Sequence, residues 1–143
     1  MRIVLDTNAL VRAHGRSSSQ ARNLLLKILE LGHRLILSNE ILAETTRVLR
    51  YPRFRALYGL AEEDLLEYTQ FLQSVSDLVV LTANYHAPMR DAADLIVLQT
   101  AERGEADILC THDSDFYEAP TLAYCAVRGI EVCNEFTLLQ RLH

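Results

Sequence analysis

The amino-acid sequence predicts an α/β fold in which helices cover both faces of a central parallel sheet. First, five short runs are almost continuously apolar, as strands buried on both faces are. Second, segments with helical periodicity separate most of these runs, and this alternation is typical of a parallel sheet between two helix layers. The five expected strands are Ile3–Leu5, Leu35–Leu37, Leu78–Leu81, Ile108–Thr111 and Ile130–Cys133.

The length and composition fit one domain that spans residues 1–143. A chain of 143 residues and 16.2 kDa has the usual size of a single domain and can bury a core without disulfides or metals. Half of the residues are hydrophobic and 23% are charged, which is a globular balance and excludes disorder and a coiled coil. No repeat, low-complexity tract or linker divides the chain.

The first expected strand is followed by a helix whose apolar residues recur at helical spacing. Ser18 or Ser19 is placed to cap its N-terminus, and Gly32 is placed to end it. This periodicity predicts a helix that buries one face against the sheet. The residues of that face are Ala21, Leu24, Leu25, Ile28 and Leu29.

Two further helices are expected before the third strand. One runs from about Asn39 to Arg50 and ends at the Tyr51–Pro52 step, because a proline disfavours helix at the residue before it. The other opens with the acids of 62–64, which suit the positive end of a helix. A fourth helix is expected from about Asp91 to Arg103, ending at Gly104, and a last one over about 135–142.

Charge and cysteine content narrow the class of protein. Fourteen basic against nineteen acidic residues give a net charge of −5, which excludes a histone-like polycation. It does not exclude a nucleic-acid enzyme, because an acidic chain can bind phosphate through metal ions. Cys110, Cys125 and Cys133 lack the paired spacing of a zinc site, so we expect reduced thiols. Apolar runs too short for a membrane span, and the lack of a signal peptide, predict a cytoplasmic protein.

Acidic residues follow two of the expected strands directly. Asp6 follows the first strand, and Asp113 and Asp115 follow the fourth. Ligands of parallel sheets bind at the carboxyl ends of the strands, so these carboxylates are expected to converge. Clustered carboxylates repel one another unless a cation neutralises them, and Mg²⁺ or Mn²⁺ prefers such oxygen ligands. Taken singly, each of these acids also suits a turn or a helix cap.

Two helices contribute further candidate acids. Glu44 lies at the border of the apolar stripe of its helix, from which its side chain reaches a cleft, although a solvated glutamate fits the same position. Glu40 lies nearer to solvent. Asp94 shares a helix face with Leu98, four residues on, and is a better candidate ligand than Asp91, which suits an N-terminal cap.

Four segments together resemble the PIN domain family, of the PilT N-terminus type. They are 3–10 with Asp6-Thr7-Asn8, 38–44 ending in Glu44, 94–101 beginning with Asp94, and 106–116 with Thr111-His112-Asp113-Ser114-Asp115. Each motif is weak alone, but their order and spacing cover essentially the whole chain. The segment 47–54, Arg-Val-Leu-Arg-Tyr-Pro-Arg-Phe, resembles the branch assigned to toxin components of toxin–antitoxin pairs.

The resemblance implies a three-layer α/β/α sandwich with strand order 3-2-1-4-5 and a Mg²⁺- or Mn²⁺-dependent ribonuclease activity. In that order the first and fourth strands are neighbours, so Asp6 and Asp113 meet. The implied catalytic and metal-binding acids are Asp6, Glu44, Asp94 and Asp113, with Asp115 as an auxiliary acid that acts through water. The resemblance implies that three polar residues orient the carboxylates or contact phosphate: Thr7, Asn8 and Thr111. Whether one or two ions bind stays open.

An arginine-rich segment is the candidate contact for RNA. Arg47, Arg50 and Arg53 are interleaved with Tyr51 and Phe54. Arginines beside aromatic side chains suit a single strand, through phosphate charge and base stacking. The alternative is that the arginines favour a helix C-terminus and that the phenylalanine is buried.

The toxin branch further implies a small antitoxin partner and a homodimer. The antitoxin is expected to insert a segment near the acidic cleft. One alternative is a PIN scaffold that binds RNA or protein with weak or no nuclease activity. A phosphohydrolase of the haloacid-dehalogenase type is disfavoured, because it requires a second aspartate where this chain has Asn8.

Overall fold

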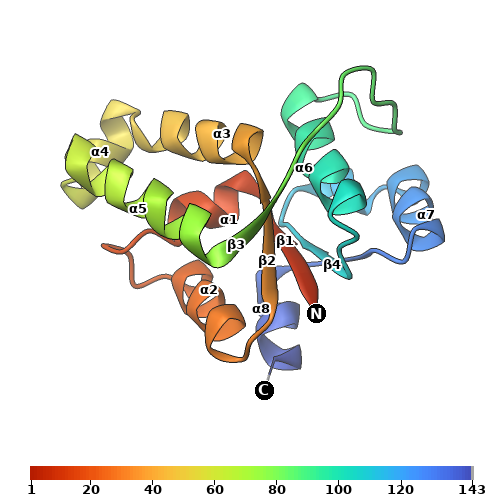
Figure 1. Ribbon diagram of the computed structural model, residues 1–143, viewed down its shortest axis with the longest axis horizontal. Coiled ribbons are helices and arrows are strands. Elements are labelled where there is room, and N and C mark those ends of the chain that lie inside the picture. The colour runs from red at the N-terminus through yellow and green to blue at the C-terminus, as the bar shows by residue number, and fades with distance from the viewer. Residues whose placement is uncertain (143) are drawn as a thin grey trace.

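The computed structural model describes residues 1–142 (Figure 1). Its centre is a five-stranded sheet of order β3-β2-β1-β4-β5 in which every neighbouring pair is parallel. The predicted fold class and strand order are therefore confirmed. The strands are β1 (Arg2–Leu5), β2 (Arg34–Ser38), β3 (Ser76–Val79), β4 (Ile108–Cys110) and β5 (Glu131–Cys133).

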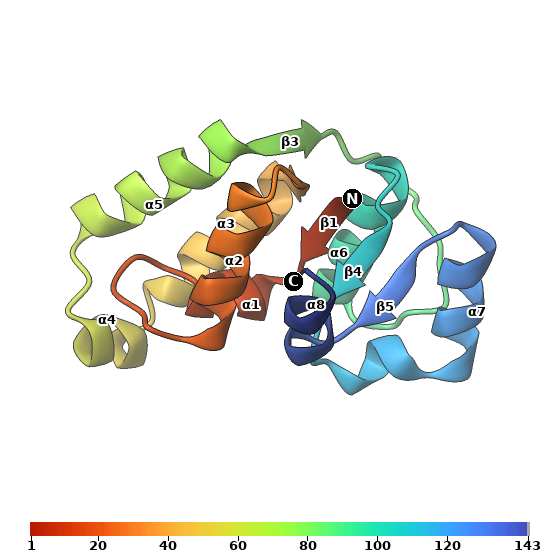
Figure 2. The same ribbon diagram turned by 90° about the horizontal axis from the view of Figure 1, so that it is seen from below.

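Helices cover both faces of this sheet. In Figure 2, α2 and α8 lie together in front of the strands, and α6 crosses behind β1 and β4. The α-helices are α1 (Thr7–Arg12), α2 (Gln20–Glu30), α3 (Asn39–Leu49), α4 (Pro52–Tyr58), α5 (Glu62–Val75), α6 (Ala92–Arg103), α7 (Ala119–Val127) and α8 (Glu135–Arg141); a 3₁₀ turn, η1, spans Ser114–Tyr117.

Short polar side chains begin several of these helices where the sequence predicts. Ser19 accepts a hydrogen bond from the backbone of Arg22 at the start of α2. Asp91 accepts from the backbone of Ala93 and Asp94 at the start of α6, as expected for a cap. Because these caps fix where each helix begins, they also fix which residues face the ends of the strands.

The structure differs from the sequence-based expectations in three additional helices and in the bounds of the third strand. The helices α1, α4 and α7 were not expected. Pro52 ends α3 but also begins α4, since a proline has the right φ for a first helical position. The third strand begins two residues earlier than the apolar run 78–81, because β3 is an edge strand and does not need apolar residues on both faces. Leu78 is 46% exposed there.

The inner strands form the centre of the hydrophobic core. The residues of 3–5 and of 35–37 are fully buried, as their continuous apolar character predicts. Cys110 and Cys133 are register partners on β4 and β5, and all three cysteines are free thiols. Within residues 1–142, no helix has both the length and the apolar character needed to cross a membrane.

Candidate active site

The carboxyl ends of β1 and β4 bring two of the predicted acids to one place. These strands are adjacent, with Leu5 opposite Cys110, and the backbone N–H of Asp6 donates to the carbonyl of Cys110 at 3.1 Å. Asp6 follows β1, and Asp113 lies three residues after β4. The topology therefore sets both residues at the same edge of the sheet.

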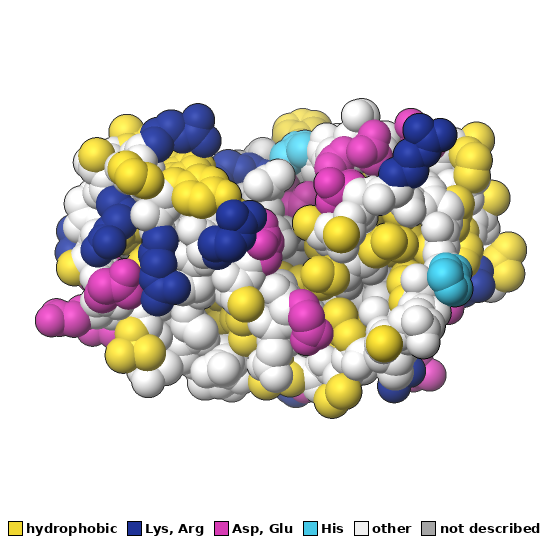
Figure 3. All heavy atoms as spheres, turned by 90° about the horizontal axis from the view of Figure 1, so that it is seen from above, with side chains coloured by type: hydrophobic (Ala, Val, Ile, Leu, Met, Phe, Trp, Pro, Cys, Tyr) yellow, Lys and Arg dark blue, Asp and Glu magenta, His cyan; other side chains and the backbone are white. Residues whose placement is uncertain are grey.

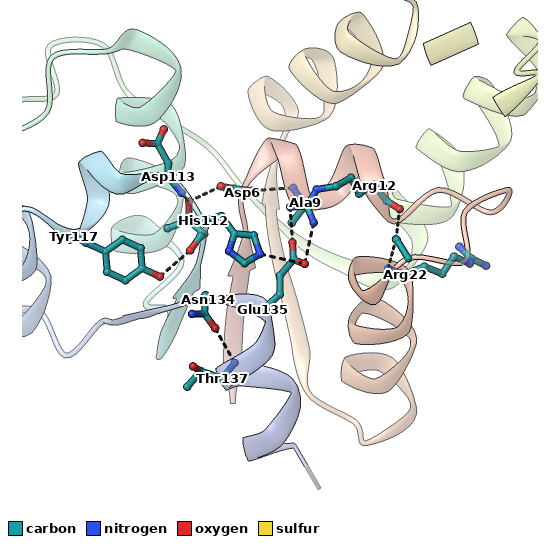
Figure 4. A network of polar contacts seen from close by, with 12 residues as sticks. Asp6, Ala9, Arg12, Arg22, His112, Asp113, Tyr117, Asn134, Glu135 and Thr137 are labelled. Carbon is teal, nitrogen blue, oxygen red and sulfur yellow. Dashed lines mark hydrogen bonds and ion pairs between the residues drawn. The ribbon is translucent and has the colours of Figure 1, made fainter. Parts of the chain in front are cut away.

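Asp6 is a buried carboxylate that two groups hold in place (Figure 4). Its Oδ1 accepts a hydrogen bond from the backbone N–H of Ala9 at 2.9 Å and so caps α1. Its Oδ2 accepts from the Thr111 hydroxyl. Burial raises the pKa of Asp6, and the hydrogen bonds from Thr111 and Ala9 oppose that rise. Asp6 is thus oriented by the fold itself.

Thr111 connects Asp6 to the acids that follow β4. Its hydroxyl oxygen also accepts a hydrogen bond from the backbone N–H of Asp113 at 3.0 Å. Asp113 in turn caps η1, because its Oδ1 accepts from the N–H of Asp115 at 2.9 Å. The hydroxyl of Tyr117 donates to the Thr111 carbonyl at 2.7 Å. This loop is therefore fixed by hydrogen bonds of its own.

The start of α6 adds a third carboxylate to the loop. One oxygen each of Asp94, Asp113 and Asp115 lie within 4.8 Å of one another. The cap at Asp91 places Asp94 on the first turn of α6, on the side that faces this loop. Among residues 1–142 this is the group of His, Cys, Asp or Glu side chains that is close enough to hold one metal ion.

The electrostatics of this cluster show that it carries excess negative charge. The pKa of Asp94 is raised from its ordinary value near 3.8 to about 7. Burial is the largest cause, followed by the charges of Asp113, Asp91, Asp115 and Asp6. A site that suppresses the ionisation of its own carboxyl group is one in which a cation would be favourable.

The donor set fits a hard divalent cation. Mg²⁺ binds oxygen ligands at about 2.0–2.1 Å, so opposite ligands lie about 4.2 Å apart. The 4.8 Å spread of the three aspartates is slightly wider, and small rotations of these side chains, of which Asp115 is exposed and the other two are half-buried, would close it. Neither sulfur nor imidazole belongs to this group, which favours Mg²⁺ or Mn²⁺ over softer metals.

Glu44 has a different partner from the three aspartates. Its carboxylate is bound by the Arg47 guanidinium, with Nη2–Oε1 at 2.6 Å and Nε–Oε2 at 3.0 Å. This contact lowers the pKa of Glu44. Glu44 borders a second hollow with Thr7, across from Ala93 at the start of α6. Its predicted role as a metal ligand stays a prediction.

The predicted RNA-binding arginines lie on the α3–α4 side of the same face. Figure 3 shows that most basic side chains of this face gather on one side of the hollow, with acidic side chains both among them and across from them. Arg47 and Arg50 are exposed and pair with Glu44 and Glu62. Arg53 is exposed, stacks on Phe54 at 4.8 Å and has no acidic partner within residues 1–142. Asn8 is exposed on α1.

One buried acid near the site was not predicted. Glu135, the first residue of α8, is 1% exposed and is bound by Arg12 (Figure 4). Arg12 Nη1 donates to Oε2 at 2.9 Å, and Nη2 lies 2.6 Å from Oε1 without hydrogen-bond alignment. His112 Nε2 is 3.4 Å from Oε2. Glu135 follows a strand closely, as Asp6 and Asp113 do, so the same rule would have identified it.

Replacing Asp94 with Asn should stabilise the metal-free protein at neutral and alkaline pH. Because the folded pKa is raised, the contribution of Asp94 to stability is full below about pH 4 and is lost as the pH rises through 7. In EDTA we expect D94N to exceed the parent by about 1–2 kcal/mol at pH 8, after a discount for solvent screening. Urea unfolding at pH 4 to 8 measures this. A difference that does not grow with pH would contradict it.

Comparison with known proteins places the chain beside others of its fold. The family model described as a PIN domain matches residues 2–115. Among solved structures, the chain is similar to one in the crystal structure of VapBC2 from Rickettsia felis bound to a DNA fragment from their promoter. The two share 15% identity over 94% of this chain and 98% of that one, with a TM-score of 0.62. No curated protein matches the sequence.

Proposed function

The chain belongs to the PIN domain family, and from this membership we propose that it is a metal-dependent endoribonuclease that hydrolyses RNA phosphodiester bonds. The observation that carries the proposal is the cluster of Asp94, Asp113 and Asp115, whose oxygens lie within 4.8 Å of one another. The raised pKa of Asp94 agrees with it, because burial and then the charges of the neighbouring aspartates oppose ionisation at a place where a cation would favour it.

Each predicted residue has a part in this proposal. Asp94, Asp113 and Asp115 hold Mg²⁺ or Mn²⁺, and the bound ion lowers the pKa of a water ligand and screens phosphate charge. Asp6, kept in one orientation by Thr111 and Ala9, faces the same site. Glu44 joins the ligands when Arg47 releases it. Thr7 and Asn8 follow Asp6 directly and contact phosphate.

The basic side of the face binds the RNA backbone. Arg53, which has no acidic partner within the described residues, supplies positive charge from α4. Arg47 and Arg50 add to it once their acidic partners are displaced or bound to metal. An RNA strand that crosses from this side to the carboxylates would therefore pass from positive to negative protein charge. The metal ion would neutralise part of that negative charge.

The toxin role is also part of the proposal. The chain shares its fold with one in VapBC2, whose crystal holds a DNA fragment from their promoter, and its 47–54 segment resembles the toxin branch. We therefore assign it a small antitoxin that inserts a segment at the acidic cleft, a homodimeric state and a place in the cytoplasm. Co-expression with the product of the adjacent reading frame, followed by co-purification and light scattering, tests the first two of these points.

Incubation of the purified chain with single-stranded RNA tests the activity. We expect internal cleavage in Mn²⁺ or Mg²⁺, no cleavage in EDTA, and recovery when metal is added back. Full activity in EDTA would contradict the metal mechanism. RNA that is bound but stays intact at every metal concentration would favour the alternative, a binding module on the PIN scaffold. The Glu44–Arg47 pair is the contact that favours this alternative, because it engages one predicted ligand.

A further inference from the structure

A hollow of about 550 Å³, lined by residues 87–90, Asp115, Glu118 and Pro120, adjoins the acidic cluster. Asp115 belongs both to the cluster and to the wall of this hollow. Its volume lies within the range of about 300–1,000 Å³ that is usual for small-molecule sites. A group that occupied it would therefore lie directly beside the proposed metal.

The wall of the hollow is held in place rather than formed by a free loop. Thr121, which is fully buried in α7, donates its hydroxyl to the Pro88 carbonyl at 3.1 Å and lies 3.3 Å from Met89 Sδ. Glu102 of α6 accepts hydrogen bonds from Tyr85 and Tyr124, both at 2.6 Å. These contacts fasten the segment 85–89 to α6 and α7. The hollow is therefore formed before any ligand binds.

The side chains around the hollow combine apolar surfaces with one basic residue, Arg90, and two acidic ones, Asp115 and Glu118. Pro88, Met89 and Pro120 offer flat or adaptable apolar surface, on which a nucleobase can stack as it does between apolar side chains in other base pockets. Arg90 suits a phosphate. Glu118 is exposed, and its side chain makes no hydrogen bond to cap α7, so its carboxylate is free to accept from a ligand.

We propose that this hollow binds the nucleobase next to the scissile phosphate and that Glu118 selects guanine. A carboxylate only accepts hydrogen bonds. Guanine presents two adjacent donors, N1–H and the N2 amino group, on its Watson–Crick edge, which is accessible in single-stranded RNA. Adenine and cytosine offer one amino group and uracil one imino group. The inference rests on the proposed ribonuclease function, and it adds the base that the site recognises.

Titration with nucleoside 5′-monophosphates tests the pocket without any cleavage, because these ligands contain no phosphodiester bond. In Mg²⁺, the backbone amide NMR signals of residues 87, 89, 90 and 115–119 should shift, and GMP should bind about 10-fold more tightly than UMP, with AMP and CMP between them. That ratio corresponds to about 1.4 kcal/mol. In Glu118→Gln the GMP preference should fall to within about 2-fold. In Arg90→Ala all four affinities should fall alike.

Glu30→Gln is the matched control, because it removes one exposed negative charge at the end of α2 and should leave the GMP preference unchanged. Equal binding of GMP and UMP by the parent chain would overturn the proposal, as would shifts confined to other segments or a preference that survives Glu118→Gln. If guanine-selective binding holds but no RNA is cleaved, the pocket assignment stands and the proposed nuclease function fails.

Discussion

Asp113→Asn and Asp94→Asn are each expected to lower Mn²⁺-dependent RNA cleavage by about 10²–10⁴-fold, the usual loss when one positioned catalytic group is removed. Each substitution takes one carboxylate from a cluster whose oxygens lie within 4.8 Å. An amide is neutral and a weaker ligand, so the affinity for the cation should fall together with the rate. Initial rates of cleavage of a labelled RNA over a Mn²⁺ titration measure both effects.

Asp91→Asn is the matched control for this prediction. It removes the same charge from the same helix end, but asparagine still caps α6, because its side-chain oxygen can accept from the N–H groups of Ala93 and Asp94. We expect its cleavage rate to stay within a few-fold of the parent. Equal losses from Asp91→Asn and Asp94→Asn would contradict the assignment of one residue as a cap and the other as a ligand.

The effect of Asp6→Asn on activity must be interpreted separately, because the Asp6 carboxylate also has a structural role. It caps α1 and accepts the Thr111 hydroxyl, so Asp6→Asn loses part of this support. A loss of activity in Asp6→Asn must therefore be compared with the thermal melt of the variant. Asp94 and Asp113 are less buried, so substitutions there separate function from folding more clearly.

The sequence predicts the inner part of the fold better than its edges. The strands β1, β2 and β4 are buried on both faces, so each is a continuous apolar run with bounds close to those expected. The edge strand β3 contains Asp77, which pairs with Arg2 and Arg34, and this polar strand has no such run. The sequence pattern does not predict the short helix α4, because Pro52 marks the end of α3 and is also the first residue of α4.

The site follows the same pattern. Asp94 and Asp113 could be identified because a strand end and a helix face constrain where their backbones lie, and the structure brings them together. Glu44 pairs with Arg47, three residues later, only when both side chains adopt suitable rotamers. Spacing along a helix permits this pairing but does not require it. The hollow beside Asp115 depends on a segment, 85–89, whose path is set by Tyr85, Glu102 and Thr121 through contacts distant in sequence.

Arg12→Met is expected to lower the free energy of unfolding by about 2–3 kcal/mol, because it leaves the Glu135 carboxylate buried without its main partner. Glu135 is 1% exposed and links the start of α8 to α1, the helix that Asp6 caps. The estimate lies at the low end for a broken buried pair, because the Arg12 side chain is 36% exposed and water can reach the vacated position. Urea denaturation should show a lower midpoint with an unchanged slope.

Two further variants decide whether this loss comes from the buried charge. In Arg12→Met/Glu135→Leu the uncompensated carboxylate is gone, so most of the lost stability should return. Arg34→Met breaks an ion pair with Asp77 in which the arginine is 59% exposed, so it should cost clearly less stability than Arg12→Met. If Arg12→Met costs no more than Arg34→Met, or if the double variant is as unstable as the single one, Glu135 is not held by its charge. In the first of these two cases the contact would act through the packing of the arginine stem, which methionine largely preserves.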